Sequence, residues 1–394
     1  MIAISRTADS NSDRHWAFLD LIRFGAALLV LFGHARGLLF EGIARVEHPN
    51  AVVRGFYLIS GLQHEGVVMF FIVSGFLVGG SAWRLIARRR FEWGTYLVNR
   101  FARIYLVLLP AFALVLALDV AGRHFFLETR FYGVRPLWPA GILDGWDWAQ
   151  IPCHLFAVQG LLCAPWGADP PLWSLGFEWG LYLVAPVVFA GLLVPMPPAR
   201  RIAVLTVTIL GLAALTWWNG DWPVWFSFWM LGVAAARLFA AGAVKLPVAL
   251  PGLFVGAVGL IVSRLAILPP LATDIMVGAG LALAVACPTV MAWPEGARAI
   301  ERGAGFSYSL YLVHLPVCVF VGALLERFGH WPARLVQPDA IGLLGFAIMV
   351  AAALVTAYLF ARCTEDHTAR VRRWLMGLRS VETAQARPAS PSGP

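Results

Sequence analysis

The sequence predicts an all-α, polytopic membrane protein with about ten transmembrane helices. Its mean hydropathy is +0.74, and 60% of its 394 residues are hydrophobic. Only 13% are charged, whereas about a quarter are charged in soluble domains. Ten apolar segments have the roughly 20 residues that cross a bilayer. They lie near residues 17–37, 66–84, 102–122, 171–194, 202–219, 222–241, 247–267, 271–292, 305–325 and 339–361.

Charge and cysteine content exclude other classes. The net charge is +8 and the pI about 9.7. The basic residues are scattered singly among apolar segments, which favours a membrane surface over nucleic acid as partner. Five cysteines without a CxxC pair argue against a disulfide framework or a zinc site, so no metal is predicted. Cys153 and Cys163 can pair if their segment is extracytoplasmic.

The Lys and Arg residues outside the spans predict the orientation. With the N-terminus inside, about 20 of them fall on the cytoplasmic side and about 9 on the other. Both termini are therefore expected to be cytoplasmic, with a segment 1–16 before the transmembrane domain 17–361 and a partly disordered tail 362–394 after it. The segment 123–170 then faces outward. Its apolar piece, IPCHLFAVQGLLCAPW, is too short to span and predicts a re-entrant or interfacial segment.

The first apolar segment, FLDLIRFGAALLVLFGHARG, contains Asp20, Arg23 and His34. From Arg23 to His34 the helix makes about three turns, so both side chains share a face, and Asp20 joins them three residues before Arg23. A charge at the centre of a membrane helix costs about 2.5 to 3.5 kcal/mol, which predicts that this face lines a polar passage. The alternative is a structural Asp20–Arg23 pair at the cytoplasmic edge and a His34 that snorkels at the other.

The second and third segments offer a packing site and a candidate anion site. In GVVMFFIVSGFLVGG, Ser74 and Gly75 permit the close approach of another helix. In VNRFARIYLVLLP, Arg100 and Arg103 are spaced i, i+3 at the start of a helix, where guanidinium groups and the helix N-terminus both favour phosphate. The alternative is that both arginines serve only orientation and anionic lipid.

The fourth segment, PLWSLGFEWGLYLVAPVVF, places Ser174, Glu178 and Tyr182 on one helix face. Glu178 is expected in the same half of the membrane as His34. A lone membrane glutamate is costly, so it should have a partner, in an active site or in a structural pair. The segments that follow are separated by only a few Gly, Pro or charged residues, which predicts antiparallel neighbours.

The ninth segment, GFSYSLYLVHLPV, places Tyr308, Tyr311 and His314 at i, i+3 and i+6. These residues lie on one side of a helix near the middle of the membrane. This side either belongs to the polar passage or is a hydrogen-bonded packing seam, and the spacing is the same for both.

Together these segments resemble acyltransferase family 3, whose bacterial integral-membrane members O-acylate polysaccharides, lipids and some small molecules. The matching pieces occur in the family's order over most of residues 17–361. They are FLDLIRFGAALLVLFGH with R-x10-H, VVMFFIVSGFLVGG, NRFARIYLVLLP with R-x-x-R, PLWSLGFEWGLYLVAP and FSYSLYLVHLPV.

The resemblance implies a ten-helix protein of the bacterial inner membrane that transfers an acyl group, commonly acetyl, from cytoplasmic acyl-CoA. The acceptor would be a hydroxyl of an extracytoplasmic or membrane-presented glycan or glycolipid. By position, His34 corresponds to the catalytic histidine, as base or transient acyl carrier. Arg23 belongs to the first-helix motif, and Arg100 and Arg103 would bind the CoA phosphates. The bilayer is the expected partner, and the sequence leaves open whether the protein forms a homodimer.

Two further motifs of the family match. The W-S-L-x-x-E element includes Trp173 and Glu178, and we hypothesise that Trp173 stacks on a sugar ring while Glu178 orients the His34 imidazole. The remaining residues assigned to substrate binding are Ser174, Tyr311 and His314.

The chain departs from the family pattern at three places. Leu21 and Ile22 stand where many members have a Gly-Leu pair, and Gly33 stands where many have a larger residue before the histidine. Val67 and Val68 replace a frequent Val-Asp. These changes alter packing near the site and weaken any inference about the acceptor, but they leave the expected reacting groups in place.

Two other classes of function remain as alternatives. A secondary transporter or a lipid or glycan exporter would use Asp20, Arg23, His34 and Glu178 as a proton or substrate pathway. It predicts gradient-dependent flux without release of CoA thiol. A membrane scaffold would explain the helices but not the polar face of the first segment.

Overall fold

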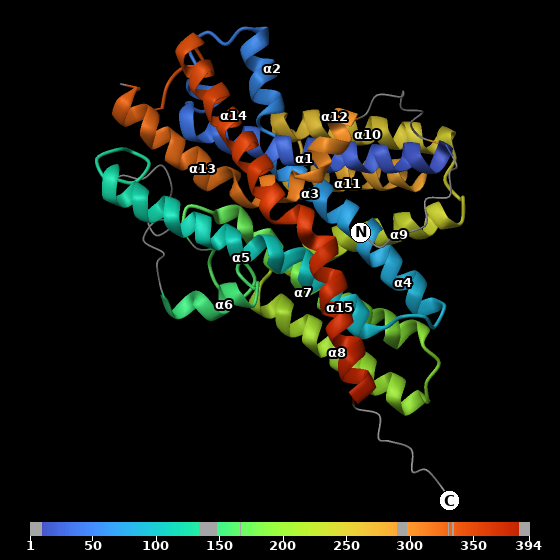
Figure 1. Ribbon diagram of the computed structural model, residues 1–394. Helices are drawn as coiled ribbons and strands as arrows, with labels where there is room; N and C mark the ends of the chain where they lie inside the picture. The colour runs from blue at the N-terminus through green and yellow to red at the C-terminus, as the bar shows by residue number, and fades with distance from the viewer. Residues whose placement is uncertain are drawn as a thin grey trace, which may run out of the picture.

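The computed structural model describes residues 10–133, 148–165, 167–289, 298–329, 331–332 and 335–385. All regular structure in these ranges is helical, and no β-strand occurs among them, which confirms the predicted all-α class (Figure 1). Within these ranges nine helices are long and apolar enough to cross a membrane, and a tenth apolar helix, α11, is shorter.

Each of the ten predicted segments coincides with a helix or a continuous helical run. These are α1 (Ser10–Leu39), α3 (Gln63–Ser74) with η2 (Gly75–Gly79) and α4 (Gly80–Ala87), α5 (Trp93–Phe125), α7 (Trp173–Leu193), α8 (Pro198–Trp218), α9 (Trp222–Ala240), α10 (Leu246–Leu265), α11 (Pro270–Ala286), α13 (Ser307–Phe328) and α14 (Ala340–Cys363). The eighth segment was predicted as 271–292, but α11 ends at Ala286, and residues 290–292 lie outside the described ranges.

Short helices connect or cover the long ones. Two lie between α1 and α3, namely η1 (Ile43–Arg45) and α2 (Ala51–Ile59); three lie between α5 and α7, namely η3 (Trp148–Gln150), α6 (Ile151–Leu155) and η4 (Pro170–Leu172). The amphipathic α12 (Arg298–Gly305) precedes α13, and η5 (Glu365–His367) with α15 (Thr368–Gln385) follows α14. The predicted tail is thus helical up to Gln385, and residues 386–394 lie outside the described ranges.

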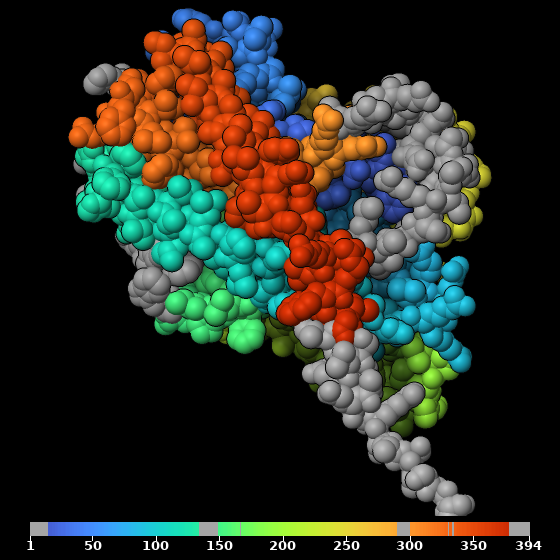
Figure 2. Space-filling model, viewed as in Figure 1, coloured from blue at the N-terminus to red at the C-terminus, as the bar shows by residue number. Residues whose placement is uncertain are grey.

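The helix α13 is the centre of the bundle. It packs against α1, α5 and α14, and 72% of its most apolar stretch is buried, compared with 0% for α8. In both views α14 and α15 (red) cross in front of the rest, and α15 lies against α5 (teal) (Figures 1 and 2). The polar motifs therefore sit on helices that face one another, whereas α8 presents its apolar side chains to the bilayer.

The second span contains a π-helical turn, η2, at the predicted close-approach site. A Cβ atom at Gly75 would overlap the carbonyl oxygen of Trp229 on α9, so only glycine allows these backbones to approach. Such turns are frequent at functional sites, and this one fixes the position of the adjacent Ser74 hydroxyl.

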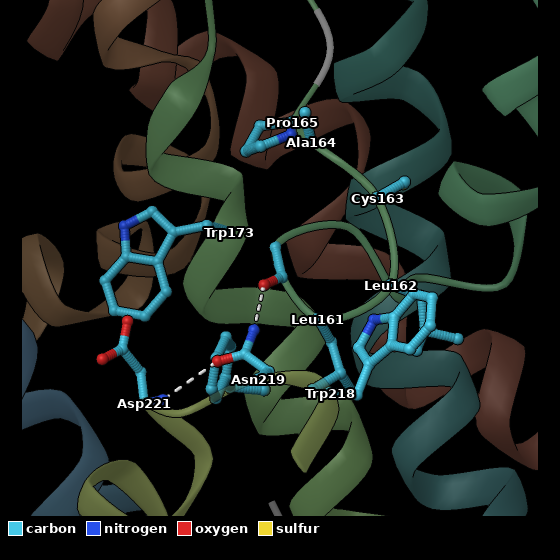
Figure 3. Close-up of a pocket in the computed structure, with 11 residues that line it drawn as sticks. Leu161, Leu162, Cys163, Ala164, Pro165, Trp173, Trp218, Asn219 and Asp221 are labelled. Atoms are coloured by element: carbon cyan, nitrogen blue, oxygen red, sulfur yellow. Dashed lines mark hydrogen bonds between the residues drawn. The ribbon is translucent and has the colours of Figure 1, made fainter. Parts of the chain in front are cut away.

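The apolar piece of the outer segment does not span. It forms the five-residue α6 and a loop that returns over the start of α7, where Gly160 lies against the backbone of Trp173 (Figure 3). Cys153 and Cys163 form a disulfide across this loop. The bond closes the loop into a fixed shape beside the bundle.

Candidate active site

A cavity of about 550 Å³ lies inside the bundle between α1, the α3–α4 run, α5, α7, α13 and the start of α15. Its ionisable lining comes from segments that are far apart in the chain. These residues are Asp20, Arg23, Arg84, Arg100, Arg103, Glu178, Glu365, Asp366 and Arg372. A polar cavity therefore lies beside the first helix, and all three arginines assigned from the sequence line it together with Asp20. His34, which was expected on the same polar face, does not line it.

The three arginines have different surroundings. Arg23 interacts with Asp20 at 3.4 Å, as its spacing predicted, and its Nη2 donates to Ser307 Oγ at 3.4 Å. Arg100 lies 5.6 Å from the ring centre of Tyr182, and its buried Nε makes no hydrogen bond within the described residues. Arg23 has an acidic partner, whereas Arg100 forms no ion pair within the described residues, so the charge of Arg100 is available to an anion in the cavity.

Arg103 belongs to a buried ion pair that the sequence analysis missed. Its Nη1 lies 2.6 Å from Glu365 Oε1, and its guanidinium lies 4.7 Å from the Tyr308 ring centre. The other carboxylate oxygen of Glu365 accepts hydrogen bonds from the backbone N and Oγ of Ser309, at 3.1 and 2.9 Å. This pair ties α5 to α13 and η5. Arg103 therefore has a structural partner, although one side of it still faces the cavity.

Glu178 forms a hydroxyl network on the cavity wall. Its Oε1 accepts hydrogen bonds from Ser74 Oγ at 2.8 Å and from the Tyr182 hydroxyl. Ser74 in turn accepts from Trp229 Nε1 at 3.2 Å. The predicted face of Ser174, Glu178 and Tyr182 thus lines the cavity, and the partners of the membrane glutamate are hydroxyls.

His34 is held by His314. His34 Nδ1 lies 2.8 Å from His314 Nε2, and the two rings stack with an interplanar angle of 16°. His314 Nδ1 lies 3.0 and 2.9 Å from the carbonyl oxygens of Leu310 and Tyr311. Carbonyls only accept, so this nitrogen carries a proton and, in the neutral ring, Nε2 accepts from His34 Nδ1. The lone pair of His34 is then on Nε2.

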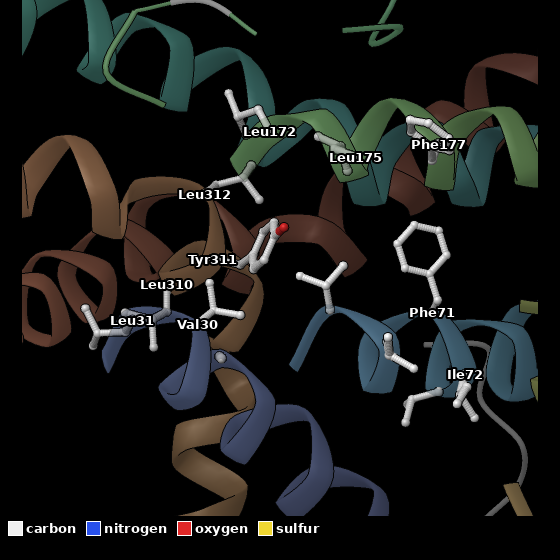
Figure 4. Close-up of a cluster of buried hydrophobic side chains, with 14 of the residues drawn as sticks. Val30, Leu31, Phe71, Ile72, Leu172, Leu175, Phe177, Leu310, Tyr311 and Leu312 are labelled. Carbon is white, nitrogen blue, oxygen red and sulfur yellow. The ribbon is translucent and has the colours of Figure 1, made fainter. Parts of the chain in front are cut away.

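The histidine pair lies behind the end of the cavity. Neither histidine lines it; the end wall includes Phe70, Ser174 and Tyr311. The Tyr311 hydroxyl lies 2.7 Å from Ser174 Oγ and donates to the Pro171 carbonyl at 3.0 Å. Its ring lies 6.1 Å from the His314 ring. Figure 4 shows Tyr311 among apolar side chains of α1, α7 and α13. Tyr311 thus lines the cavity and also lies beside the His314 ring.

The family model for the acyltransferase domain matches residues 16–362, which include the cavity and both histidines. The chain belongs to acyltransferase family 3. It is a multi-pass membrane acyltransferase. Searches of curated proteins and of solved structures found no match.

Within this acyltransferase, two roles assigned from the sequence fall on different residues. Glu178 was expected to orient the His34 imidazole, but its hydrogen bonds go to Ser74 and Tyr182, and the imidazole is bonded to His314 instead. His314 was assigned to substrate binding, but its side chain is buried behind Tyr311, and only 1% of it is exposed. Glu178 and His314 lie on different helices, and spacing along one helix does not specify which side chains of another helix it meets.

The departure of Gly33 from the family pattern has a local reason. A Cβ atom at this position would overlap the side chain of Gln63 at the start of α3. Because Gly33 has no side chain, the Gln63 side chain can pack against the helical turn of α1 that carries His34. The sequence analysis did not single out Gln63, because it belongs to none of the matched motifs. Its position just before the second predicted span was the one indication that it could lie near the first helix.

Trp173 lies on the opposite side of the α7 start from its neighbour Ser174. It lines a second, open pocket of about 460 Å³, whereas Ser174 lines the cavity. Trp173 therefore does not contact the inner cavity of the acyltransferase.

Proposed function

We propose that this acyltransferase moves an acyl group from cytoplasmic acyl-CoA, most commonly acetyl-CoA, to a hydroxyl of a glycan or glycolipid at the outer side of a bacterial inner membrane. One observation carries the proposal: a cavity lined with arginines ends at Tyr311, directly in front of a hydrogen-bonded histidine pair. The cavity would bind the anionic donor on one side of Tyr311, and His34 would act as the general base on the other.

The donor's phosphates bind among the cavity arginines. Arg100 supports this role most directly, because it lines the cavity and forms no ion pair within the described residues, while Arg23 is engaged with Asp20. Arg103 keeps the ion pair with Glu365 and contributes positive potential. The pantetheine arm runs along the α1 face of the cavity toward Tyr311.

The chemistry follows from the hydrogen-bond direction in the histidine pair. The acceptor oxygen attacks the thioester carbonyl carbon while its proton moves to Nε2 of His34. The tetrahedral intermediate then expels CoA as thiolate, the carbon–sulfur bond breaks, and the imidazolium returns the proton to the sulfur. The products are the ester and CoA thiol. His314 is a positioning residue, because it keeps the His34 proton on Nδ1 and the lone pair on Nε2.

Access to His34 requires the end wall to open. His34 is partly exposed but does not line the cavity, so the thioester reaches it when the Tyr311 side chain moves away from Ser174. A wall that opens only after both substrates have bound would also keep water away from the thioester.

The disulfide between Cys153 and Cys163 supports the assignment of sides. Disulfides persist in oxidising compartments, and this loop lies at the end of the bundle opposite α12, α15 and the arginine cluster in the predicted topology. The Lys and Arg distribution favours the same orientation.

The test uses sealed proteoliposomes that contain the purified protein and its glycan acceptor fraction, with radiolabelled acetyl-CoA added to one face only. We expect CoA thiol release and labelled ester when the donor meets the predicted cytoplasmic face. His34→Ala should lower both by roughly three orders of magnitude, whereas His124→Ala, an exposed histidine at the outer end of α5, should not. Retained transfer in His34→Ala removes the histidine from the chemistry. Solute flux without thiol release favours the transporter.

A further inference from the structure

We propose that the open pocket at the outer end of α7 is the subsite for a sugar ring of the acceptor. This inference rests on the proposed function and names the substrate class of its outer side. In the proposed complex the ring lies against Trp173 and Trp218 and donates hydroxyl hydrogen bonds to Asp221.

The pocket is built from three segments that meet at the outer surface. They are the disulfide loop 160–165, the turn 218–221 between α8 and α9, and the start of α7 at Trp173 (Figure 3). Its volume of about 460 Å³ falls in the range of small-molecule sites, roughly 300 to 1,000 Å³. The pocket is therefore large enough for a saccharide unit and open enough for a longer glycan to leave it.

One hydrogen bond joins the two loops of the pocket, and a second fixes the conformation of the turn 218–221. Asn219 Nδ2 donates to the Gly160 carbonyl at 3.0 Å, and the backbone N of Asp221 donates to Asn219 Oδ1 at 3.1 Å. Gly160 has a φ of +78°, and a Cβ atom there would overlap the backbone of Trp173. Only glycine fits this position, and the site is preorganised without a ligand.

The chemistry of the lining matches a carbohydrate. Trp173 is held by packing at 4.9 Å against Trp225, while Trp218 is 67% exposed. The Asp221 side chain makes no capping hydrogen bond to α9 and lies on the side of the pocket that carries the Trp173 indole (Figure 3). Aromatic faces contact the C–H surfaces of sugars, and an exposed carboxylate accepts two hydroxyl hydrogen bonds.

The pocket is connected to the reaction centre through adjacent residues. Trp173 directly precedes Ser174, which contacts the Tyr311 hydroxyl at 2.7 Å, and the Tyr311 ring lies 6.1 Å from that of His314. An acceptor in the pocket and a donor in the cavity would therefore approach the same barrier from opposite sides of the α7 terminus. This arrangement fits transfer across a membrane between two substrates that never share a compartment.

The experiment expresses variants in a host strain from which the native gene is deleted. Alkali-labile acetyl esters are measured separately in the total envelope glycan and in the lipid extract, and the Kd for acetyl-CoA is measured on purified protein. Trp218→Ala and Asp221→Asn should lower glycan esters at least about fivefold and leave the acetyl-CoA Kd unchanged. The matched controls are Trp217→Ala, which alters a 93% exposed neighbour outside the pocket lining, and Glu47→Gln, which removes an exposed outer carboxylate. Both should match wild type.

Three results would overturn the inference. The pocket variants could retain wild-type glycan esters, the esters could be lost only from the lipid extract, or the acetyl groups on the glycan could be alkali-stable amides, which indicates an amine acceptor. Failure of the underlying function looks different, because the wild-type protein would then release no CoA thiol and form no ester. If Trp218→Ala no longer binds acetyl-CoA, this variant is misfolded. The glycan esters formed by Asp221→Asn then decide the inference.

Discussion

The inner cavity and the histidine pair are both polar regions inside the helix bundle, but they contain different kinds of groups. The cavity collects ionised side chains, and its buried carboxylate Glu365 has both a cation and a hydroxyl as partners. Within the described residues the histidine pair has no charged hydrogen-bond partner, and backbone carbonyls of one helix turn anchor it. Tyr311 belongs to the cavity lining, and its ring lies 6.1 Å from that of His314.

This difference supports the proposal that the donor binds in one region and reacts in the other. Burying an unpaired charge is costly, so charges are expected where a hydrated, anionic donor would bind. The imidazoles hydrogen-bond to each other and to backbone carbonyls, which fixes the ring of His314 and, through it, the tautomer of His34. Substitutions in the two regions should therefore affect different quantities, namely stability or donor KM in the cavity and kcat at the histidines.

The largest effect is expected for Arg103→Ala. Glu365 has a side chain that is only 5% exposed and would be left with an uncompensated charge, so the free energy of unfolding should fall by about 3 kcal/mol. Thermal unfolding in detergent measures this change. The control is Arg362, which forms an exposed ion pair with Asp366 and has a side chain 65% exposed. Arg362→Ala should lower the free energy of unfolding by less than about 1 kcal/mol. If Arg103→Ala is stable but has a raised KM for the donor, Arg103 binds the donor phosphates directly and is not mainly structural.

The next largest effect is expected for His314→Ala. Without an acceptor for the His34 Nδ1 proton, the proton is no longer confined to Nδ1, and Nε2 is less often free to act as the base. We therefore expect kcat to fall roughly 100-fold while the KM for acetyl-CoA stays the same. Steady-state thiol release measures both constants. In His314→Gln the amide oxygen can accept the same proton, and this variant should recover part of the activity. If Gln is as inactive as Ala, His314 does not act through the tautomer.

A smaller effect is expected for Arg100→Ala. Removal of its guanidinium should raise the KM for acetyl-CoA about tenfold with little change in kcat. Acetyl-pantetheine, which has no phosphate, provides an internal test, because its KM should not change. Arg90→Ala alters an exposed arginine outside the cavity and serves as the control. Equal effects on both donors would place Arg100 at the acyl end instead.

The smallest effect concerns the outer segment. Asp169 is fully buried, and its carboxylate oxygens make no hydrogen bond within the described residues. Burial, together with the nearby Asp119, raises the pKa of Asp169 well above its usual value. The folded state then binds more protons than the unfolded one, so stability is lost as the pH rises through the folded pKa. Asp169→Asn should reduce the drop in Tm between pH 5 and pH 8 by roughly 2 °C or more, and the exposed Asp221→Asn should not. An unchanged pH dependence would show that Asp169 is not protonated in the folded state.

Much of the architecture was determined by the sequence alone. Ten apolar helices followed from hydropathy, and within the described residues nine of them are long enough to span a membrane. A helix satisfies its own backbone in lipid and needs about 20 apolar residues to cross. The shared face of Ser174, Glu178 and Tyr182 followed from helical spacing, as did the contact of Asp20 with Arg23. These features depend on residues within a few turns of one another.

The tertiary structure decided which of these faces meet. The bond from His34 to His314 joins residues 280 positions apart, and the pair of Arg103 with Glu365 joins residues 262 apart. No local pattern specifies such partners, because the rotation of each helix is set by how its side chains fill the gaps left by its neighbours. For the same reason helical spacing could not specify that Trp173 lines a pocket separate from the cavity that Ser174 lines.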